Sequence, residues 1–300
     1  MKNAFAWLMI LFLSVAALLG ATYQKVIRSN VSLVDIYFNA LDKKDRPITG
    51  LKKDDFQVFE NGIEQEIEFF SETQKREDAI LTIALIIDTS GSVKDKLRFE
   101  IDTAAEFFRE ILRPKKDLAL VVQFDSEVNL VQDFTQDQDD LIRALDSLRA
   151  GGNTSLYDAI YLIAEEKLRY EAGRKVMVVI SDGEDTSSLV SREEAIEAAQ
   201  TSDTLIYGLG VRGAGSIGNF SALENFCERT GGAFFSPRAE FKKLQEAFQS
   251  IGRELRGQYS LAYSPKDRRK NGTFRAVEIR CREKGVKIRA RRGYYAPTGD

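Results

Sequence analysis

The stretch ILTIALIIDTSGS, residues 80–92, decides the fold. Its first eight residues are apolar except for one threonine, which is typical of a strand buried on both faces of a parallel sheet. The polar residues Asp88 to Ser92 follow at once, and apolar residues then recur with helical spacing over residues 94–112. An acid and two hydroxyls therefore stand at the carboxyl end of a buried strand, where open α/β sheets bind ligands. Side-chain oxygens of this kind suit a hard cation such as Mg²⁺.

Apolar strands and amphipathic helices alternate over residues 80–257. The predicted strands are 80–87, 118–124, 175–180, 204–209 and 233–236, and the predicted helices are 94–112, 137–148, 156–170, 191–200, 221–230 and 240–256. Ser191 and Ser221 each have a glutamate three residues later, which is the capping-box pattern that opens a helix. We therefore expect an α/β fold with a doubly wound, mostly parallel sheet, similar to Rossmann folds, with helices on both faces.

The segments on either side of this region have β character. Alternating residues predict a strand near 31–40, the turn Asn61-Gly62 predicts a hairpin from 56 to 70, and further strands are expected at 259–263, 274–282 and 286–291. Residues 54–72 contain seven acids and no Lys or Arg, whereas residues 266–292 contain twelve Lys or Arg and three acids. We expect the two segments to pack together as one small, sandwich-like β domain, although binding of the basic segment to a polyanion or anionic lipid is an alternative.

This pattern divides the chain into four parts. Residues 1–22 form a signal peptide or membrane anchor, because the apolar stretch 4–21 follows Lys2; a buried N-terminal helix is the alternative. Residues 23–78 are the first part of the β domain, 79–257 the α/β domain, and 258–300 the remaining β segment. The protein is then exported, and is periplasmic, secreted or anchored to the outer face of the cytoplasmic membrane.

In an exported protein Cys227 and Cys281 could form a disulfide, but Cys227 has the spacing of a core residue.

Composition excludes several classes of enzyme and partner. The chain contains no histidine, which rules out Ser-His-Asp and Cys-His catalysis and histidine-based zinc sites. A net charge of −3 argues against nucleic-acid binding by the whole chain. The sequence has neither the glycine-lysine loop of nucleotide-binding proteins nor the serine elbow of α/β hydrolases.

Two further loops carry side chains suited to the same cation. The glycine-rich stretch GGNTS, residues 151–155, precedes a predicted helix and offers Thr154. The stretch SDGED, residues 181–185, follows the apolar run 175–180 and offers Asp182. Because such loops meet at one edge of a doubly wound sheet, we expect a shared metal site. Five side chains form this candidate metal site: Asp88, Ser90, Ser92, Thr154 and Asp182. Each has a plainer explanation, as a helix cap for Asp88 and Thr154 and as a turn residue for Asp182.

These motifs resemble the von Willebrand factor type A domain family and its metal-ion-dependent adhesion site. The family's D-x-S-x-S element corresponds to residues 88–92, its threonine to Thr154 in GGNTSLYDAI, and its second aspartate to Asp182 in VVISDGEDT. The flanking stretches VFENGIEQEI, YSLAYSP and RRGYYAP are similar to a bacterial group of exported proteins that carry this domain. The resemblance implies that Ser90 and Ser92 ligate the ion directly, Thr154 directly or through water, and the two aspartates mostly through water.

The resemblance also implies the function. We expect a non-enzymatic, extracytoplasmic protein-binding or adhesion module, in which an Asp or Glu carboxylate of a partner protein completes the coordination of a bound Mg²⁺; Mn²⁺ and Ca²⁺ are alternatives. Two other hypotheses stay open. One is an envelope scaffold with a vestigial metal site, and the other a Mg²⁺-dependent hydrolase with Asp88 as nucleophile. The partner and the oligomeric state are not specified by the sequence.

Overall fold

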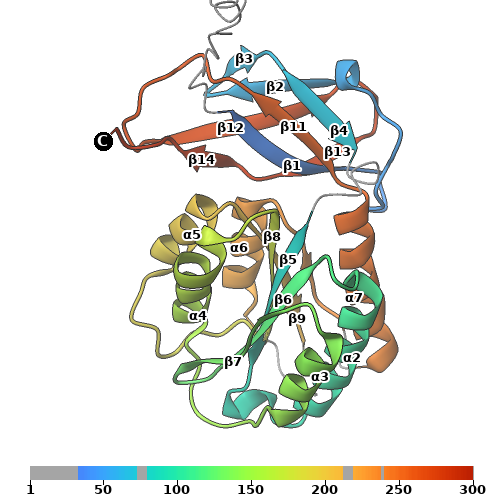
Figure 1. Cartoon of the computed structure of the whole chain (residues 1–300), viewed down its shortest axis with the longest axis vertical. Helices are drawn as coiled ribbons and strands as arrows, with labels where there is room; N and C mark the ends of the chain where they lie inside the picture. Colours follow the sequence, from blue (N-terminus) through green and yellow to red (C-terminus); the bar gives the residue numbers. More distant parts are fainter. Residues whose placement is uncertain (1–32, 73–79, 212–218, 238–239, 300) are drawn as a thin grey trace, which may run out of the picture. The chain divides into compact units, whose positions relative to one another are not determined.

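A central six-stranded sheet with helices on both faces forms the middle of the chain (Figure 1). The computed structural model describes residues 33–72, 80–211, 219–237 and 240–299. The central sheet has the strand order β10-β9-β8-β5-β6-β7, and all neighbours are parallel except β6 and β7. In that order, the strands are Phe234–Phe235, Thr204–Gly210, Arg174–Ser181, Leu81–Asp88, Leu118–Phe124 and Val128–Thr135. The predicted α/β fold class is confirmed.

Strand β7 was not predicted from the sequence. It lies at the edge of the sheet and pairs only with β6, in antiparallel orientation. Its residues alternate irregularly between half-buried and exposed, and they include Asn129, Gln132 and Asp133. An edge strand needs no continuous apolar run, because one side of it faces solvent. The apolar pattern that revealed the buried strands is therefore absent from β7.

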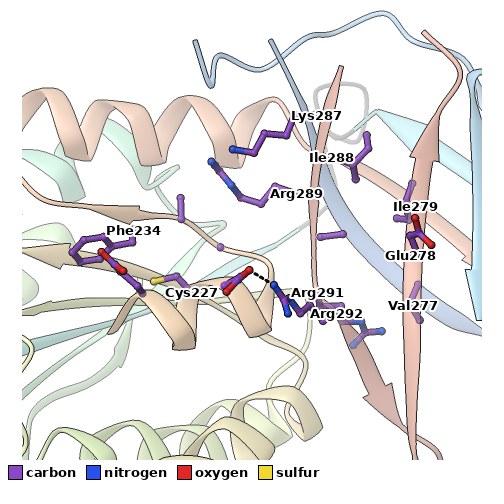
Figure 2. Close-up of a pocket in the computed structure, with 15 residues that line it drawn as sticks. Cys227, Phe234, Val277, Glu278, Ile279, Lys287, Ile288, Arg289, Arg291 and Arg292 are labelled. Atoms are coloured by element: carbon purple, nitrogen blue, oxygen red, sulfur yellow. Dashed lines mark hydrogen bonds and ion pairs between the residues drawn. The ribbon is translucent and has the colours of Figure 1, made fainter. Parts of the chain in front are cut away.

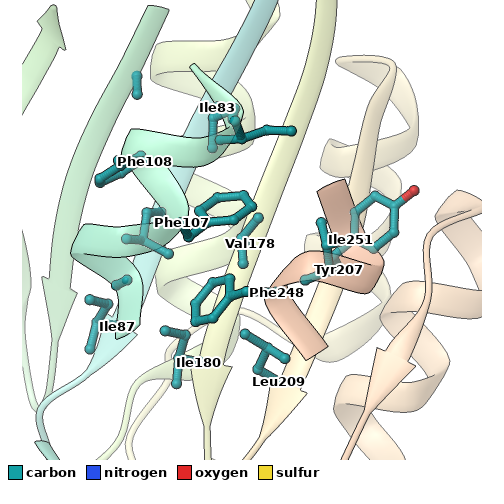
Figure 3. Close-up of a cluster of buried hydrophobic side chains, with 14 of the residues drawn as sticks. Ile83, Ile87, Phe107, Phe108, Val178, Ile180, Tyr207, Leu209, Phe248 and Ile251 are labelled. Atoms are coloured by element: carbon teal, nitrogen blue, oxygen red, sulfur yellow. The ribbon is translucent and has the colours of Figure 1, made fainter. Parts of the chain in front are cut away.

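The helices cover the two faces of the sheet in two groups. Helices α2 (Leu97–Ile111), α3 (Gln138–Ser147) and α7 (Phe241–Arg256) pack on one face, and α4 (Leu156–Leu162), α5 (Arg192–Thr201) and α6 (Ser221–Thr230) on the other. Figure 3 shows the first face, where Phe107 of α2 and Phe248 of α7 lie over the strands, with ring centroids 4.8 Å apart. Short π and 3-10 turns, η4 (Ile163–Lys167) and η5 (Leu168–Tyr170), extend α4 as far as the predicted helix.

The two predicted capping boxes had different outcomes. Ser191 accepts a hydrogen bond from the Glu194 amide, and Glu194 accepts one from the Ser191 amide, so this capping box is confirmed. The prediction at Ser221 was wrong, because Ser221 is the first residue of α6 and its amide and hydroxyl both donate to Asn219 Oδ1. An asparagine side chain often hydrogen-bonds the backbone two residues onward, as Asn219 does here. Phe220 is the N-cap, so α6 begins one residue earlier than the serine predicted.

Two antiparallel four-stranded sheets contain the remaining strands. Their orders are β13-β1-β11-β4 and β14-β12-β2-β3. Strands β1 to β4 are Val34–Leu41, Phe56–Glu60, Ile63–Gln65 and Phe69–Glu72, and β11 to β14 are Tyr259–Tyr263, Phe274–Cys281, Lys287–Ala290 and Gly293–Tyr295. Both sheets therefore combine residues from before and after the α/β segment, because β1 pairs with β11 and β2 with β12. The predicted single strand after Asn61-Gly62 is in fact two, β3 and β4, which belong to different sheets.

The acidic and basic segments are joined by a buried ion pair within this pair of sheets. Arg275 and Glu60 are 3% and 2% exposed, and a nitrogen of the guanidinium lies 3.4 Å from a carboxylate oxygen. The hydroxyls of Tyr263 and Tyr294 donate to the other oxygen of Glu60, at 2.9 and 2.8 Å. Burial and the neighbouring Glu60 raise the pKa of Tyr294 to about 12, so this hydroxyl keeps its proton at neutral pH. One pair of opposite charges from the two segments is thus buried, whereas Lys287, Arg289 and Arg292 pair with acids outside residues 54–72.

The two cysteines are free thiols. Cys227 lies on α6 and is buried in the core, as its spacing predicted, and burial raises the pKa of its thiol, which therefore keeps its proton. The predicted signal peptide or anchor, residues 1–22, lies outside the described residues. The helices within the described part of the chain are all too short or too polar to cross a membrane.

Candidate metal centre

Three loops at the carboxyl edge of the central sheet are joined by backbone hydrogen bonds. The loop after β5 contacts the glycine-rich loop twice, because Gly151 N donates to Thr89 O at 2.7 Å and Gly91 N to Gly152 O at 3.1 Å. The loop after β8 joins them through Thr186 N, which donates to Thr154 O at 2.8 Å. The three sequence stretches that carry the five predicted residues therefore lie side by side.

Asp88 is held in place by two donors. It is the last residue of β5 and is fully buried. Its Oδ1 accepts from Ser90 N at 2.9 Å, and its Oδ2 accepts from the Ser181 hydroxyl at 2.7 Å. Burial raises the pKa of Asp88, and the hydrogen bonds from Ser90 and Ser181 oppose that rise. The carboxylate is thus fixed by the loops on both sides of it.

The hydroxyls of Ser90 and Ser92 have the spacing of two metal ligands. Their oxygens lie 3.1 Å apart. Adjacent oxygens of an octahedral Mg²⁺ site, each 2.0–2.1 Å from the ion, lie about 2.9 Å apart. Ser92 also donates to Asp182 Oδ2 at 2.6 Å, so this aspartate holds the hydroxyl of a candidate ligand in place. The donor set therefore fits a hard divalent cation.

Thr154 has a hydroxyl that is free to bind an ion. The residue is buried, its amide donates to Thr186 Oγ1 at 3.0 Å, and its carbonyl accepts from the amides of Thr186 and Ser187. Among the described residues, none forms a recorded hydrogen bond with the Thr154 hydroxyl. The backbone is fixed on both sides, so the hydroxyl is the one group of Thr154 left for a ligand.

A further acid lies in the interior near the site. Glu100 of α2 is 1% exposed, and its Oε2 has no hydrogen-bond partner. The pKa of Glu100 is raised to about 8: burial is the main cause, the positive charge of Lys96 opposes the rise, and the negative charges of Asp88 and Asp182 add to it. The Lys96 ammonium itself donates to Val211 O at 2.7 Å. At neutral pH Glu100 therefore keeps its proton, and the negative charges near it are those of Asp88 and Asp182.

Clusters of acids alone do not explain the site. Within the described residues, no group of three or more Cys, Asp or Glu has the arrangement of a metal site. An ion bound here would therefore depend on serine and threonine hydroxyls, which the D-x-S-x-S element and Thr154 supply.

Sequence reasoning missed two residues at or near the centre, Ser181 and Glu100. Ser181, which holds Asp88, stands within the stretch SDGED but was given no role. Asp158, in the first turn of α4, supports the neighbouring loop, because its carboxylate accepts from Leu189 N and Val190 N. Glu100 carried no signal, because a single acid among the apolar residues of a helix is ordinarily taken to face solvent.

A cavity of about 490 Å³ lies away from this centre, between α6 and strands β12 and β13 (Figure 2). Its lining includes none of the five predicted residues. The basic side chains of β13 and the following turn that line it are paired with acids; for example, Arg292 contacts Glu228 and Arg289 contacts Glu254. The basic side chains of this cavity are therefore already paired.

Comparison with known proteins identifies the domain. Residues 82–250 match the family model of the von Willebrand factor type A domain. An uncharacterized protein of Borreliella burgdorferi is 25% identical over 214 residues, 62% of each chain. Proximal thread matrix protein 1 from the mussel byssus has a similar fold, with a TM-score of 0.54 at 17% identity over 66% of this chain and 51% of that one. Another structure of the mussel protein, with a zinc-occupied MIDAS motif, has a TM-score of 0.52 at 18% identity over 63% and 49% of the two chains. The chain thus spans less than two thirds of these relatives.

Proposed function

Because the chain belongs to the von Willebrand factor type A domain family, we propose that it is a non-enzymatic module that binds a partner protein through a divalent cation. The cation lies at the carboxyl edge of the central sheet. It is held by Asp88, Ser90, Ser92, Thr154 and Asp182. The mussel protein with a zinc-occupied motif supports a metal role for this fold.

The single observation that carries the proposal is the spacing of the two serine hydroxyls, 3.1 Å, beside a free threonine hydroxyl. The hydroxyls that would contact the ion directly are neutral, and the two aspartates act mostly through water, so the direct ligands leave the positive charge of the ion largely uncompensated. A carboxylate from an Asp or Glu of the partner protein then supplies the missing charge and completes the coordination. Mg²⁺ is the ion that this all-oxygen donor set favours, with Mn²⁺ and Ca²⁺ as alternatives.

The surroundings of Asp88 argue against a hydrolase. A nucleophilic carboxylate needs one oxygen facing the substrate, whereas both oxygens of Asp88 accept hydrogen bonds and the side chain is fully buried. We also propose that the protein acts outside the cytoplasm, because the apolar stretch 4–21 follows Lys2 at the start of the chain. The segment either anchors the protein or is removed.

Calorimetric titration of Mg²⁺ and Mn²⁺ into the protein tests the metal site. We expect saturable one-site binding that is lost in Ser90→Ala/Ser92→Ala and retained in the control Ser221→Ala/Ser250→Ala, whose serines lie on helices α6 and α7. Circular dichroism checks that each variant is folded. The same titration in excess acetate supplies a carboxylate. Absence of saturable binding with and without acetate would contradict the proposal and favour a vestigial site.

A further inference from the structure

The side chain of Leu189 is almost completely exposed to solvent. It is 96% exposed, more than any other large apolar side chain among the described residues. A single exposed leucine is ordinary on a protein surface and by itself indicates nothing. Leu189 differs because the Asp158 carboxylate accepts hydrogen bonds from its amide and from the next one, and these contacts hold its backbone in place.

The first of these contacts comes from Asp158, in the first turn of α4. Both oxygens of its carboxylate accept from Leu189 N at 3.0 Å, and one also accepts from Val190 N at 2.9 Å. Hydrogen bonds to an ionised acceptor are stronger than those between neutral groups. The carboxylate therefore fixes the peptide units on both sides of the exposed side chain.

The preceding residue, Ser188, makes the reverse contact. Its hydroxyl accepts from Tyr157 N and Asp158 N at 3.1 Å and donates to Asp185 Oδ1 at 2.5 Å. The loop thus caps the start of α4, while α4 holds the loop through Asp158. Ser188 of the loop accepts from amides of α4, and Asp158 of α4 accepts from amides of the loop, so these contacts hold the loop against the start of the helix.

The same loop is joined to the metal centre. Two amides of the loop, Thr186 N and Ser187 N, donate to Thr154 O at 2.8 and 3.1 Å, and Thr154 N donates to Thr186 Oγ1 at 3.0 Å. The loop runs from Asp182 to the start of α5, and α4 and α5 both begin at the carboxyl edge of the sheet. Leu189 therefore lies on a loop that hydrogen bonds join to Thr154 of the candidate metal site.

We propose that Leu189 is the apolar anchor of the interaction surface around the metal, and that the partner protein buries it in an apolar recess close to the carboxylate that it offers. This inference rests on the proposed function. An ion alone binds any accessible carboxylate, so selectivity requires a second contact at a fixed distance from it. The exposed polar residues Glu184 and Thr186 lie on the same loop and form the kind of rim that surrounds an apolar anchor.

A displayed library of short peptides, each with one Glu or Asp among randomised positions, tests the inference. The library is selected on the full chain in Mn²⁺ and eluted with a chelator. We expect the eluted peptides to share an apolar residue at a fixed spacing from the acid. Leu189→Ser should weaken their binding about tenfold, which corresponds to burial of one leucine side chain.

The control variant is Tyr170→Ser, which removes an exposed apolar side chain that precedes β8, at the opposite edge of the sheet. It should bind the selected peptides as the unmodified chain does. Chelator-eluted peptides that lack a common apolar residue, or that bind Leu189→Ser unchanged, would overturn the inference and leave metal-dependent binding intact. If no peptide is eluted by chelator, the proposed function itself fails, and the inference with it.

Discussion

Replacement of Glu100 by glutamine should stabilise the protein increasingly as the pH rises. Glu100 is buried in α2, and no hydrogen bond satisfies its Oε2. Burial raises its pKa to about 8 from an ordinary value of 4.5, with Asp88 and Asp182 contributing. Glutamine has nearly the shape of the protonated acid and cannot ionise, so the variant removes the cost of a buried negative charge.

The expected magnitude follows from linkage between protonation and folding. Below pH 4.5 Glu100 is protonated in both the native and the unfolded chain, so its charge costs nothing. Between pH 4.5 and 8 the native protein keeps a proton that the unfolded chain has lost, and stability therefore falls by about 1.4 kcal/mol per pH unit. Above pH 8 the group is ionised in both states, and the full cost is roughly 5 kcal/mol. At pH 7 the Glu100→Gln variant should gain about 3 kcal/mol.

Guanidinium unfolding between pH 5 and pH 9 measures the effect, with chelator present to keep metal ions away from Asp88 and Asp182. The two stability curves should nearly meet at pH 5 and separate steadily up to pH 8. Glu110→Gln provides the control, because Glu110 lies on the same helix but is exposed. If the stability difference between Glu100→Gln and the unmodified protein is the same at every pH, the reasoning about the buried acid is refuted.

Three further changes test the packing described above. Arg275→Met leaves Glu60 buried without its cation and should lower the free energy of unfolding by about 3–5 kcal/mol in urea titration, whereas an unchanged midpoint would contradict a buried ion pair. Gly232→Ala places a Cβ 2.0 Å from Ile206 O, so we expect a loss of about 3 kcal/mol, measured by thermal unfolding; a normal melting temperature would contradict this close contact. Ser191→Ala removes the cap of α5 and should cost about 1 kcal/mol in the same assay, and an unaltered value would show that the cap contributes little.

The parts of the fold that are buried on both faces were predictable from the sequence. The strands at 80–87, 118–124, 175–180 and 204–209 each match an observed strand to within a residue, because a strand covered by helices on both faces must be apolar throughout. The same logic located the candidate centre. Residues directly after such strands must lie at the carboxyl edge of the sheet, and the loops that carry Asp88 and Asp182 do so. Their role as metal ligands stays a prediction.

The parts that were missed depend on neighbours distant in sequence. Strand β7 owes its pairing to β6 and not to an apolar pattern of its own. The stretch after Gly62 was expected to continue as one strand, but it divides because β3 pairs with β2 while β4 pairs with β11. The register between segments some 190 residues apart is invisible in a local pattern. Glu100 was missed for the same reason, since only the packed interior shows that its carboxyl is buried.

Ion pairs join the antiparallel sheets to the α/β segment of the chain. Arg291, beside β13, contacts Asp203, which directly precedes β9, and Arg289 contacts Glu254 in the last turn of α7. Both acids lie at the amino edge of the central sheet. The candidate metal loops lie at the carboxyl edge, because they follow β5 and β8. These ion pairs therefore lie at the edge opposite to the candidate metal loops, so a partner bound at those loops would compete with none of them.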